Sequence, residues 1–150
     1  MDTIRIIFTH RKWNPVSWLI RWAVPRSRFS MALSSHCLID AGVAVYEANM
    51  LHGVRCVPYE VAMKGLTVAK VIEYQVPNAM AGYAFASAQV GTPYDWPGAL
   101  GLGLTPGRDW KQDDKWFCCE FAAATLQAAG RPLFANITHV GETAMMAINP

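Results

Sequence analysis

Two strand-like segments separated by a very short turn set the strongest limit on how this chain can fold. The runs SSHCLID (34–40) and VAVYEAN (43–49) are rich in apolar residues and meet at Ala41 and Gly42. Strands joined by so few residues pair antiparallel, because a parallel pair needs a crossover of about a dozen residues. Gly42 suits the turn, where a positive φ is often required. The sequence therefore predicts a β-hairpin and, with it, an antiparallel sheet.

Further strands and helices follow from apolar β-branched runs and from helix start and stop signals. Asn is a favoured N-cap, Pro is tolerated in the first helical turn, and Gly commonly follows a helix end. The predicted strands besides the hairpin are TIRIIFT (3–9) and LTVAKVIEYQV (66–76), and the predicted helices run from Asn14 to about Pro25, from Asn78 to Gly91 and from near Trp116 to Gly130, with short helical turns in VPYEVAMKG (57–65) and VGETAMMAI (140–148).

This order of elements predicts a single α+β domain spanning residues 1–150. A strand and a helix are followed by three strands and then mainly by helices, with no internal repeat and no linker. We expect a small antiparallel or barrel-like sheet covered by helices on one side. A chain of 150 residues is long enough to bury one hydrophobic core.

Charge and composition exclude several classes of partner. The formal net charge is +2, which is too small to indicate a nucleic-acid-binding protein. No apolar run approaches the roughly 18 residues of a membrane-spanning helix, so no transmembrane segment is expected. The Gly-rich loop GALGLGLTPG (98–107) lacks the Lys-Ser/Thr ending of a phosphate-binding loop. We therefore expect no nucleotide and no other cofactor.

The four cysteines include an adjacent pair at a predicted helix start, in Phe117-Cys118-Cys119-Glu120. No C-x-x-C spacing occurs, so neither a structural zinc site nor any other metal is expected, and reduced thiols are the default. A helix N-terminus favours a thiolate, and its free N–H groups can bind an oxyanion. One thiol could therefore be a nucleophile. The alternative is a buried pair that only packs, and helical periodicity does not choose between the two thiols.

A histidine and a glutamate on the predicted hairpin offer a base and its orienting group. If the turn is centred on Ala41 and Gly42, Asp40 pairs with Val43, and His36 then lies directly opposite Glu47. Opposed side chains share one face of a sheet and come into contact. A carboxylate beside a histidine fixes the imidazole tautomer and raises its basicity. The alternative is an ordinary cross-strand ion pair. The other histidines, His10, His52 and His139, are expected at the surface.

These residues, in this order, resemble the permuted NlpC-like papain-fold family of the YaeF/YiiX type, in which the histidine strand precedes the cysteine helix. The resemblance spans most of the chain. The matching pieces are Ser35-His36, Glu47-Ala48 with Gly53-Val54, Gly91-Thr-Pro-Tyr94-Asp95, Phe117-Cys118-Cys119-Glu120 and Ala129-Gly130.

The resemblance implies a circularly permuted papain-like fold with Cys118 as nucleophile, His36 as general base and Glu47 as the orienting residue. Cys119 occupies a position where the family has serine. Tyr94 matches a family tyrosine that lines the cleft; its alternative is packing under a Pro/Gly-rich loop.

The expected activity is that of a cysteine peptidase or amidase, which hydrolyses an amide or related acyl bond through an acyl-enzyme. Substrates implied by the resemblance are peptides, cell-wall peptides, other amides and lipid-linked acyl groups. The alternatives are an acyltransferase or thioesterase on lipid-linked acyl groups, and a non-catalytic binding module that keeps the fold. No secretory signal is recognised at the N-terminus, which predicts a cytoplasmic location in the producing cell. Delivery by lysis or within a virion, from a phage or prophage gene, would be compatible with a cell-wall substrate.

Overall fold

The computed structural model describes residues 1–11, 15, 34–99, 114–138 and 140–148. Most of the helix predicted from Asn14 to about Pro25 lies outside these residues, as do His139 and much of the Gly-rich loop. The described residues of that loop, 98 and 99, end a helical turn that spans residues 96–99.

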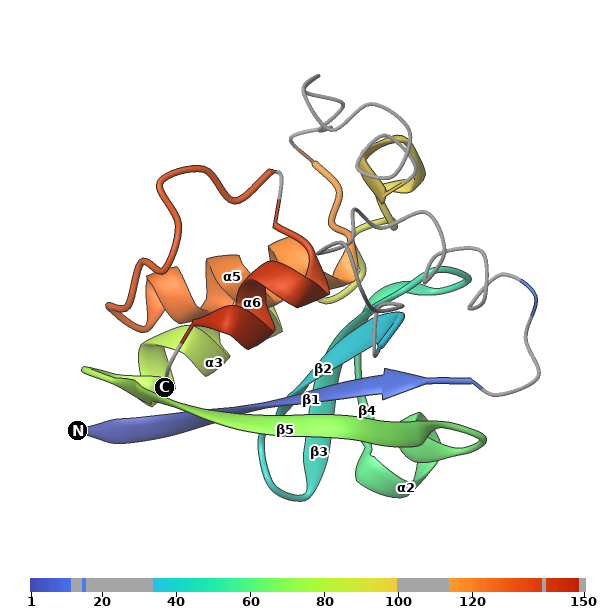
Figure 1. The fold of residues 1–150 in the computed structure, drawn as a ribbon, viewed down its shortest axis with the longest axis horizontal. Helices are drawn as coiled ribbons and strands as arrows, with labels where there is room; N and C mark the ends of the chain where they lie inside the picture. The colour runs from blue at the N-terminus through green and yellow to red at the C-terminus, as the bar shows by residue number, and fades with distance from the viewer. Residues whose placement is uncertain (12–14, 16–33, 100–113, 139, 149–150) are drawn as a thin grey trace.

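The described strands form one five-stranded antiparallel sheet, so the expected α+β class is confirmed (Figure 1). Its strand order is β4-β3-β2-β1-β5, and β1 in the interior of the sheet pairs with both β2 and β5. The strands are β1 (Asp2–His10), β2 (His36–Asp40), β3 (Ala44–Asn49), β4 (Gly53–Pro58) and β5 (Thr67–Val76).

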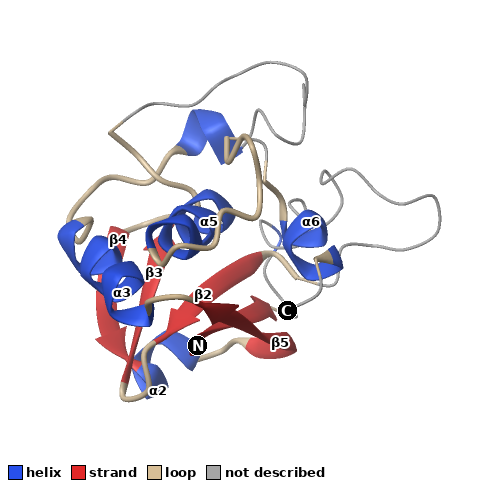
Figure 2. Cartoon of the chain, turned by 90° about the vertical axis from the view of Figure 1, so that its left-hand side faces the viewer, coloured by secondary structure: helices blue, strands red, loops and turns tan. Residues whose placement is uncertain are grey.

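Helices cover both faces of the sheet, although the sequence predicted them on one face only. The larger group of helices lies on one side and the short helix α2 on the other, as Figures 1 and 2 show. The second side is closed because β1, β2 and β3 each bury an apolar residue there, around Ala62 of α2. Among the described residues, the helices with stated bounds are α2 (Tyr59–Met63), α3 (Ala79–Ala88), α5 (Cys118–Ala128) and α6 (Glu142–Ala147).

The helix starts and ends predicted from local sequence signals agree well with the structure. The Asn78 side chain caps α3 by accepting a hydrogen bond from the Ala81 N–H at 3.0 Å, as expected of an N-cap. Gly91 and Gly130 follow α3 and α5 with φ values of 97° and 87°, a backbone region that favours glycine. The helix expected near Trp116 begins two residues later, at Cys118.

The hairpin register differs from the prediction by two residues. Ile39 pairs with Tyr46 and Asp40 with Val45, whereas the sequence reading paired Asp40 with Val43. The turn tip is Gly42-Val43, and the Asp40 carboxylate accepts a hydrogen bond from the Gly42 N–H at 2.8 Å. A shift of two residues returns every side chain to the same face of the sheet, so the expected contact of His36 with Glu47 survives the error.

Strand β4 was missed by the sequence reading. It pairs with β3 along its whole length, from Asn49 opposite Gly53 to Ala44 opposite Pro58. Its start is tied to the segment before Tyr94, because the Val54 N–H donates to the Thr92 carbonyl at 2.8 Å. A Cβ at Gly53 would lie 2.2 Å from that carbonyl oxygen, so the close approach requires glycine.

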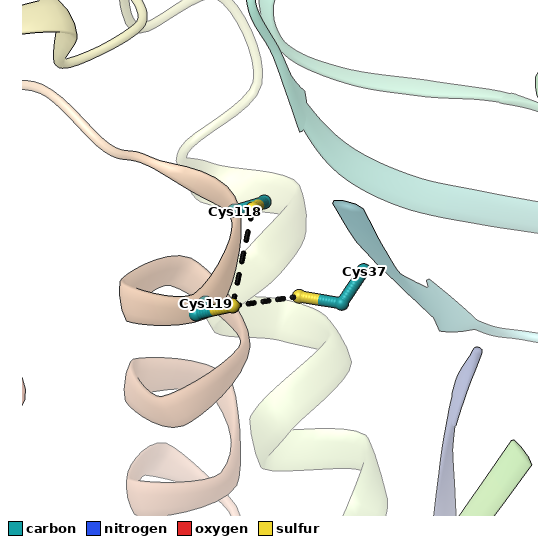
Figure 3. A group of neighbouring side chains, drawn as sticks. All are labelled: Cys37, Cys118 and Cys119. Carbon is teal, nitrogen blue, oxygen red and sulfur yellow. Dashed lines mark hydrogen bonds between the residues drawn. The ribbon is translucent and has the colours of Figure 1, made fainter. Parts of the chain in front are cut away.

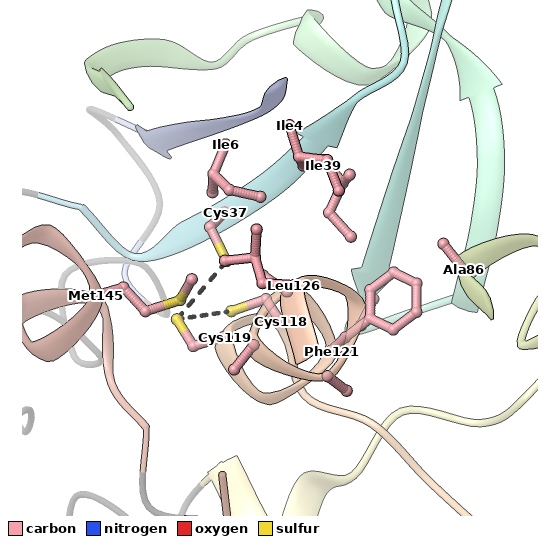
Figure 4. Close-up of a cluster of buried hydrophobic side chains, with 14 of the residues drawn as sticks. Ile4, Ile6, Cys37, Ile39, Ala86, Cys118, Cys119, Phe121, Leu126 and Met145 are labelled. Atoms are coloured by element: carbon pink, nitrogen blue, oxygen red, sulfur yellow. Dashed lines mark hydrogen bonds between the residues drawn. The ribbon is translucent and has the colours of Figure 1, made fainter. Parts of the chain in front are cut away.

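Helix α5 is the main core helix on its side of the sheet. All residues from Cys118 to Leu126 are buried. Figure 4 shows its inner side, with Phe121 and Leu126, facing Ile39 of β2. This packing holds the first turn of α5 against the end of the β2–β3 hairpin, where the predicted site residues lie.

Candidate active site

His36 and Glu47 form a short contact at the end of the hairpin. The His36 Nε2 atom lies 2.6 Å from Glu47 Oε2. The Glu47 side chain is only 2% exposed and that of His36 is 18% exposed. Because Nε2 is engaged by Glu47, Nδ1 is the ring nitrogen left for another partner. The contact predicted from the sequence is therefore present.

Arg55 of β4 completes the surroundings of Glu47. Its Nε donates to Glu47 Oε1 at 2.7 Å and its Nη2 lies 2.5 Å from the same oxygen. Burial alone would raise the pKa of Glu47, but hydrogen bonds and charges from His36 and then Arg55 lower it below its ordinary value. Glu47 is thus held as a carboxylate with a separate partner for each oxygen.

Cys118 is the first residue of α5, and its thiol lies near enough to the His36 ring for the two groups to shift each other's pKa. The pKa of Cys118 is held well below its usual value near 9. The causes are hydrogen bonds from Cys119 and Cys37 and, against the effect of burial, the hydrogen bond and charge of His36. A helix N-terminus also favours a thiolate. Both effects favour ionisation of the Cys118 thiol.

The pKa of His36 is shifted in the opposite direction. Burial acts to lower it, but hydrogen bonds with Cys118 and Glu47, followed by their negative charges, raise the pKa from 6.5 to about 10. The two shifts run in opposite directions, and each favours the charged form of its group.

Two further thiols lie near Cys118, and Figure 3 shows Cys119 between Cys118 and Cys37. The Cys37 and Cys119 sulfurs are 3.6 Å apart, and the Cys118 and Cys119 sulfurs are 3.9 Å apart. The pKa values of both thiols are raised well above the ordinary value. The main cause for Cys37 is a hydrogen bond with Cys118, and the main cause for Cys119 is burial. Neighbouring thiols cannot all ionise in a buried site, and the directions of these shifts favour ionisation at Cys118 over Cys37 and Cys119.

Tyr94 lines a pocket next to these residues. The pocket has a volume of about 160 Å³ and is also lined by His36, Glu47 and Arg55, with an apolar wall that includes Ala62 and Leu66. Tyr94, the residue expected to line a cleft, is thus part of the wall of this pocket. Burial and then the charge of Cys118 raise the pKa of its hydroxyl well above 10, so Tyr94 is neutral at physiological pH.

The backbone couples Tyr94 to the helix that carries Cys118. Tyr94 forms a bridge with Trp116, and the Asp95 N–H donates to the Trp116 carbonyl at 3.0 Å. Trp116 lies two residues before Cys118. The segment that carries Tyr94 in the pocket wall is therefore hydrogen-bonded to the segment that leads into α5.

Sequence reasoning missed three polar residues of this region: Arg55, Cys37 and Glu142. Arg55 was missed because β4 was not recognised. Cys37 adjoins His36 but is 82 residues from Cys119, so no spacing signal linked the two thiols. Glu142 is buried at the start of α6, where burial and then the charge of Cys118 raise its pKa to about 8.

The remaining histidines that are described lie elsewhere. His52 is exposed in the turn between β3 and β4, as expected. His10 is the last residue of β1 and half-buried, whereas the sequence reading placed it in a solvated turn.

Comparisons of the chain with protein-family models, with curated proteins and with solved structures found no match. In the described residues no helix is long and apolar enough to cross a membrane. The function must therefore be argued from the site itself.

Proposed function

We propose that this protein is a cysteine hydrolase that cleaves an amide or related acyl bond, with Cys118 as nucleophile, His36 as proton carrier and Glu47 as the orienting residue. The observation that carries the proposal is the 2.6 Å contact of the His36 ring with the buried Glu47 carboxylate, beside a Cys118 thiol that is near enough for Cys118 and His36 to shift each other's pKa. These groups come from three different elements, and a nucleophile, a base and its orienting group in this order form a catalytic triad.

In the proposed mechanism, the Cys118 thiolate attacks the carbonyl carbon and the carbonyl oxygen becomes an oxyanion. The Cys118 backbone N–H, free at the first position of α5, donates to that oxyanion. Protonated His36 then gives its proton to the leaving amine or alcohol, which leaves an acyl group on the sulfur. Neutral His36 next takes a proton from water, hydroxide attacks the thioester, and the carboxylic acid departs as the thiolate forms again.

The pocket, which is lined by His36 and Glu47 but not by Cys118, favours a substrate with a small apolar group near the scissile bond. Its wall combines the polar residues of the triad region with apolar side chains such as Val61, Ala62 and Leu66. A volume of about 160 Å³ accommodates an aliphatic side chain or a short acyl segment. Peptides, cell-wall peptides and lipid-linked acyl compounds, the substrate classes implied by the family resemblance, all present such a group.

The apolar wall also favours one second candidate, acyl transfer from a thioester or lipid-linked donor to an amine or alcohol. The acyl-enzyme is common to both reactions, and only the group that attacks it differs. Product analysis with and without an added amine separates the two. Formation of the free acid alone, even with abundant amine, would leave hydrolysis as the reaction.

Selective alkylation tests the thiolate directly. Iodoacetamide at pH 6 to 7 is expected to modify Cys118 at least about tenfold faster than Cys56, because alkylation requires the thiolate. Cys56 is a matched control: it is exposed, whereas Cys118 is 6% exposed, so accessibility alone predicts the opposite order. Peptide mass spectrometry of timed samples measures both rates. Equally slow modification of all four cysteines would contradict the enzyme proposal and favour a non-catalytic module.

Arg55 is proposed as a positioning residue for Glu47. In Arg55→Met the Glu47 carboxylate loses one of its two partners, and kcat for p-nitrophenyl acetate, a generic acyl substrate, is expected to fall about tenfold. The pKa of Glu47 should rise without the arginine charge, so activity should be lost at a higher pH as the solution is acidified. Arg55→Lys should recover part of the lost kcat and part of the activity lost at acidic pH. A pH–rate profile of Arg55→Met identical to that of the wild type would exclude this role.

A further inference from the structure

Three cysteine sulfurs converge on one point between β2 and the start of α5. Cys37 comes from β2, and Cys118 and Cys119 come from the first turn of α5. All three sulfurs lie within 4.8 Å of one another, and all three side chains are buried (Figure 3). The proposed triad uses only Cys118, so the approach of the other two thiols needs a separate explanation.

The spacing of these sulfurs matches that of thiolates around one metal ion. A zinc–sulfur bond is about 2.3 Å long, so two thiolates of a tetrahedral zinc site lie about 3.8 Å apart. The Cys37–Cys119 and Cys118–Cys119 distances are 3.6 and 3.9 Å. An ion could therefore bind to these sulfurs with little movement of α5 relative to β2.

The chemistry of the donors selects the kind of ion. Sulfur is a soft ligand and prefers thiophilic ions such as zinc and cadmium over magnesium and calcium, which bind oxygen. We propose that Cys37, Cys118 and Cys119 form a three-thiolate site for a thiophilic divalent cation of the zinc group.

A buried carboxyl group responds to the charge of the cluster. For Glu142, at the start of α6, burial and then the charge of Cys118 raise the pKa to about 8. Three sulfurs leave the fourth position of a tetrahedral ion to an oxygen donor, and Glu142 is a described carboxyl whose pKa responds to Cys118. Each thiol that carries a proton releases it when the metal–sulfur bond forms, so binding is accompanied by proton release.

Binding has a consequence that rests on the proposed function. The cation would share the lone pairs of the Cys118 sulfur and thereby block its attack on a carbonyl. Zinc should therefore inhibit hydrolysis of p-nitrophenyl acetate, and a chelator should reverse the inhibition. The site itself does not depend on the activity, because its ligands and geometry are independent of any substrate.

Cadmium titration of the reduced, chelator-treated full chain tests the site without using activity. We expect one cadmium ion per chain and a near-ultraviolet thiolate-to-cadmium charge-transfer band of an intensity typical of three thiolates. Cys37→Ser should weaken zinc binding by more than about 100-fold, beyond the 10- to 100-fold typical of residues that only support ligands. Cys56→Ser, which changes a cysteine outside the cluster, should bind as the wild type does.

The absence of the charge-transfer band in the wild type would overturn the site, whether or not the variants fold. So would equal effects of Cys37→Ser and Cys56→Ser, with circular dichroism used to verify that both are folded. An inactive protein that shows the Cys37-dependent band would contradict the hydrolase proposal and leave the metal site supported. An active protein without the band would contradict the metal site and leave the hydrolase proposal supported.

Discussion

Replacing Cys118 with alanine should reduce hydrolysis of p-nitrophenyl acetate to the rate of buffer alone, a loss of about 10³-fold or more. The reason is that the sulfur supplies the new bond of the acyl-enzyme, and no other described side chain is placed against His36 in the same way. The release of nitrophenol, followed by its absorbance, measures the rate. A burst of one nitrophenol per chain should precede steady turnover in the wild type and be absent from Cys118→Ala.

Cys119→Ser is the matched control for that experiment. The two cysteines are adjacent, but Cys119 points to Cys37 and Cys118, and its pKa is raised by burial. A serine hydroxyl retains a donor for the Cys118 thiolate, so activity should stay within about tenfold of the wild type. If Cys119→Ser is inactive and Cys118→Ala is active, the assignment of the nucleophile is wrong.

Replacing His36 with alanine should have the second largest effect, with kcat/KM reduced by about 10³-fold. The variant loses the proton carrier for both halves of the reaction. It also loses the positive charge that stabilises the thiolate. Thiol groups are weak donors, so the hydrogen bonds from Cys119 and Cys37 should not replace that charge. Activity and alkylation of Cys118 should therefore fall together.

The pH dependence of alkylation shows whether His36→Ala raises the pKa of Cys118. The pKa of Cys118 is lowered in the wild type, so its thiolate is present well below pH 9. In His36→Ala that pKa should rise toward the ordinary value, and alkylation at pH 6 should slow by about tenfold or more. Above pH 9 both proteins carry a thiolate and the rates should converge. A constant ratio of rates from pH 6 to pH 10 would indicate a change in access, not in pKa.

Most secondary structure was predictable because its signals are local. The Asn78 cap, the glycines after α3 and α5, and the apolar runs of β1 and β5 each depend on a few neighbouring residues. Strand β4 was not recognised, because it carries Arg55 and ends at Pro58. Its stability comes from pairing with β3, which is a property of two segments together.

The candidate site was predictable only in part. His36 and Glu47 belong to one hairpin, so an antiparallel register brought them together even though it was wrong by two residues. Cys118 was placed at a helix start by local signals, but its contact with His36 depends on how α5 packs on the sheet. The same packing brings Cys37 to Cys119, and nothing in the spacing of the cysteines encodes it.

The division of the site between two distant segments has a consequence for the newly made protein. Glu47 is 11 residues from His36 and 8 from Arg55, so this acid–base unit can form as soon as its hairpins do. The thiol joins it only when α5 docks, a long-range contact that is expected to form late in folding. Until then Cys118 is an ordinary, protonated thiol. The proposed site should therefore stay inactive until α5 has packed on the sheet, because the Cys118 thiol meets His36 only then.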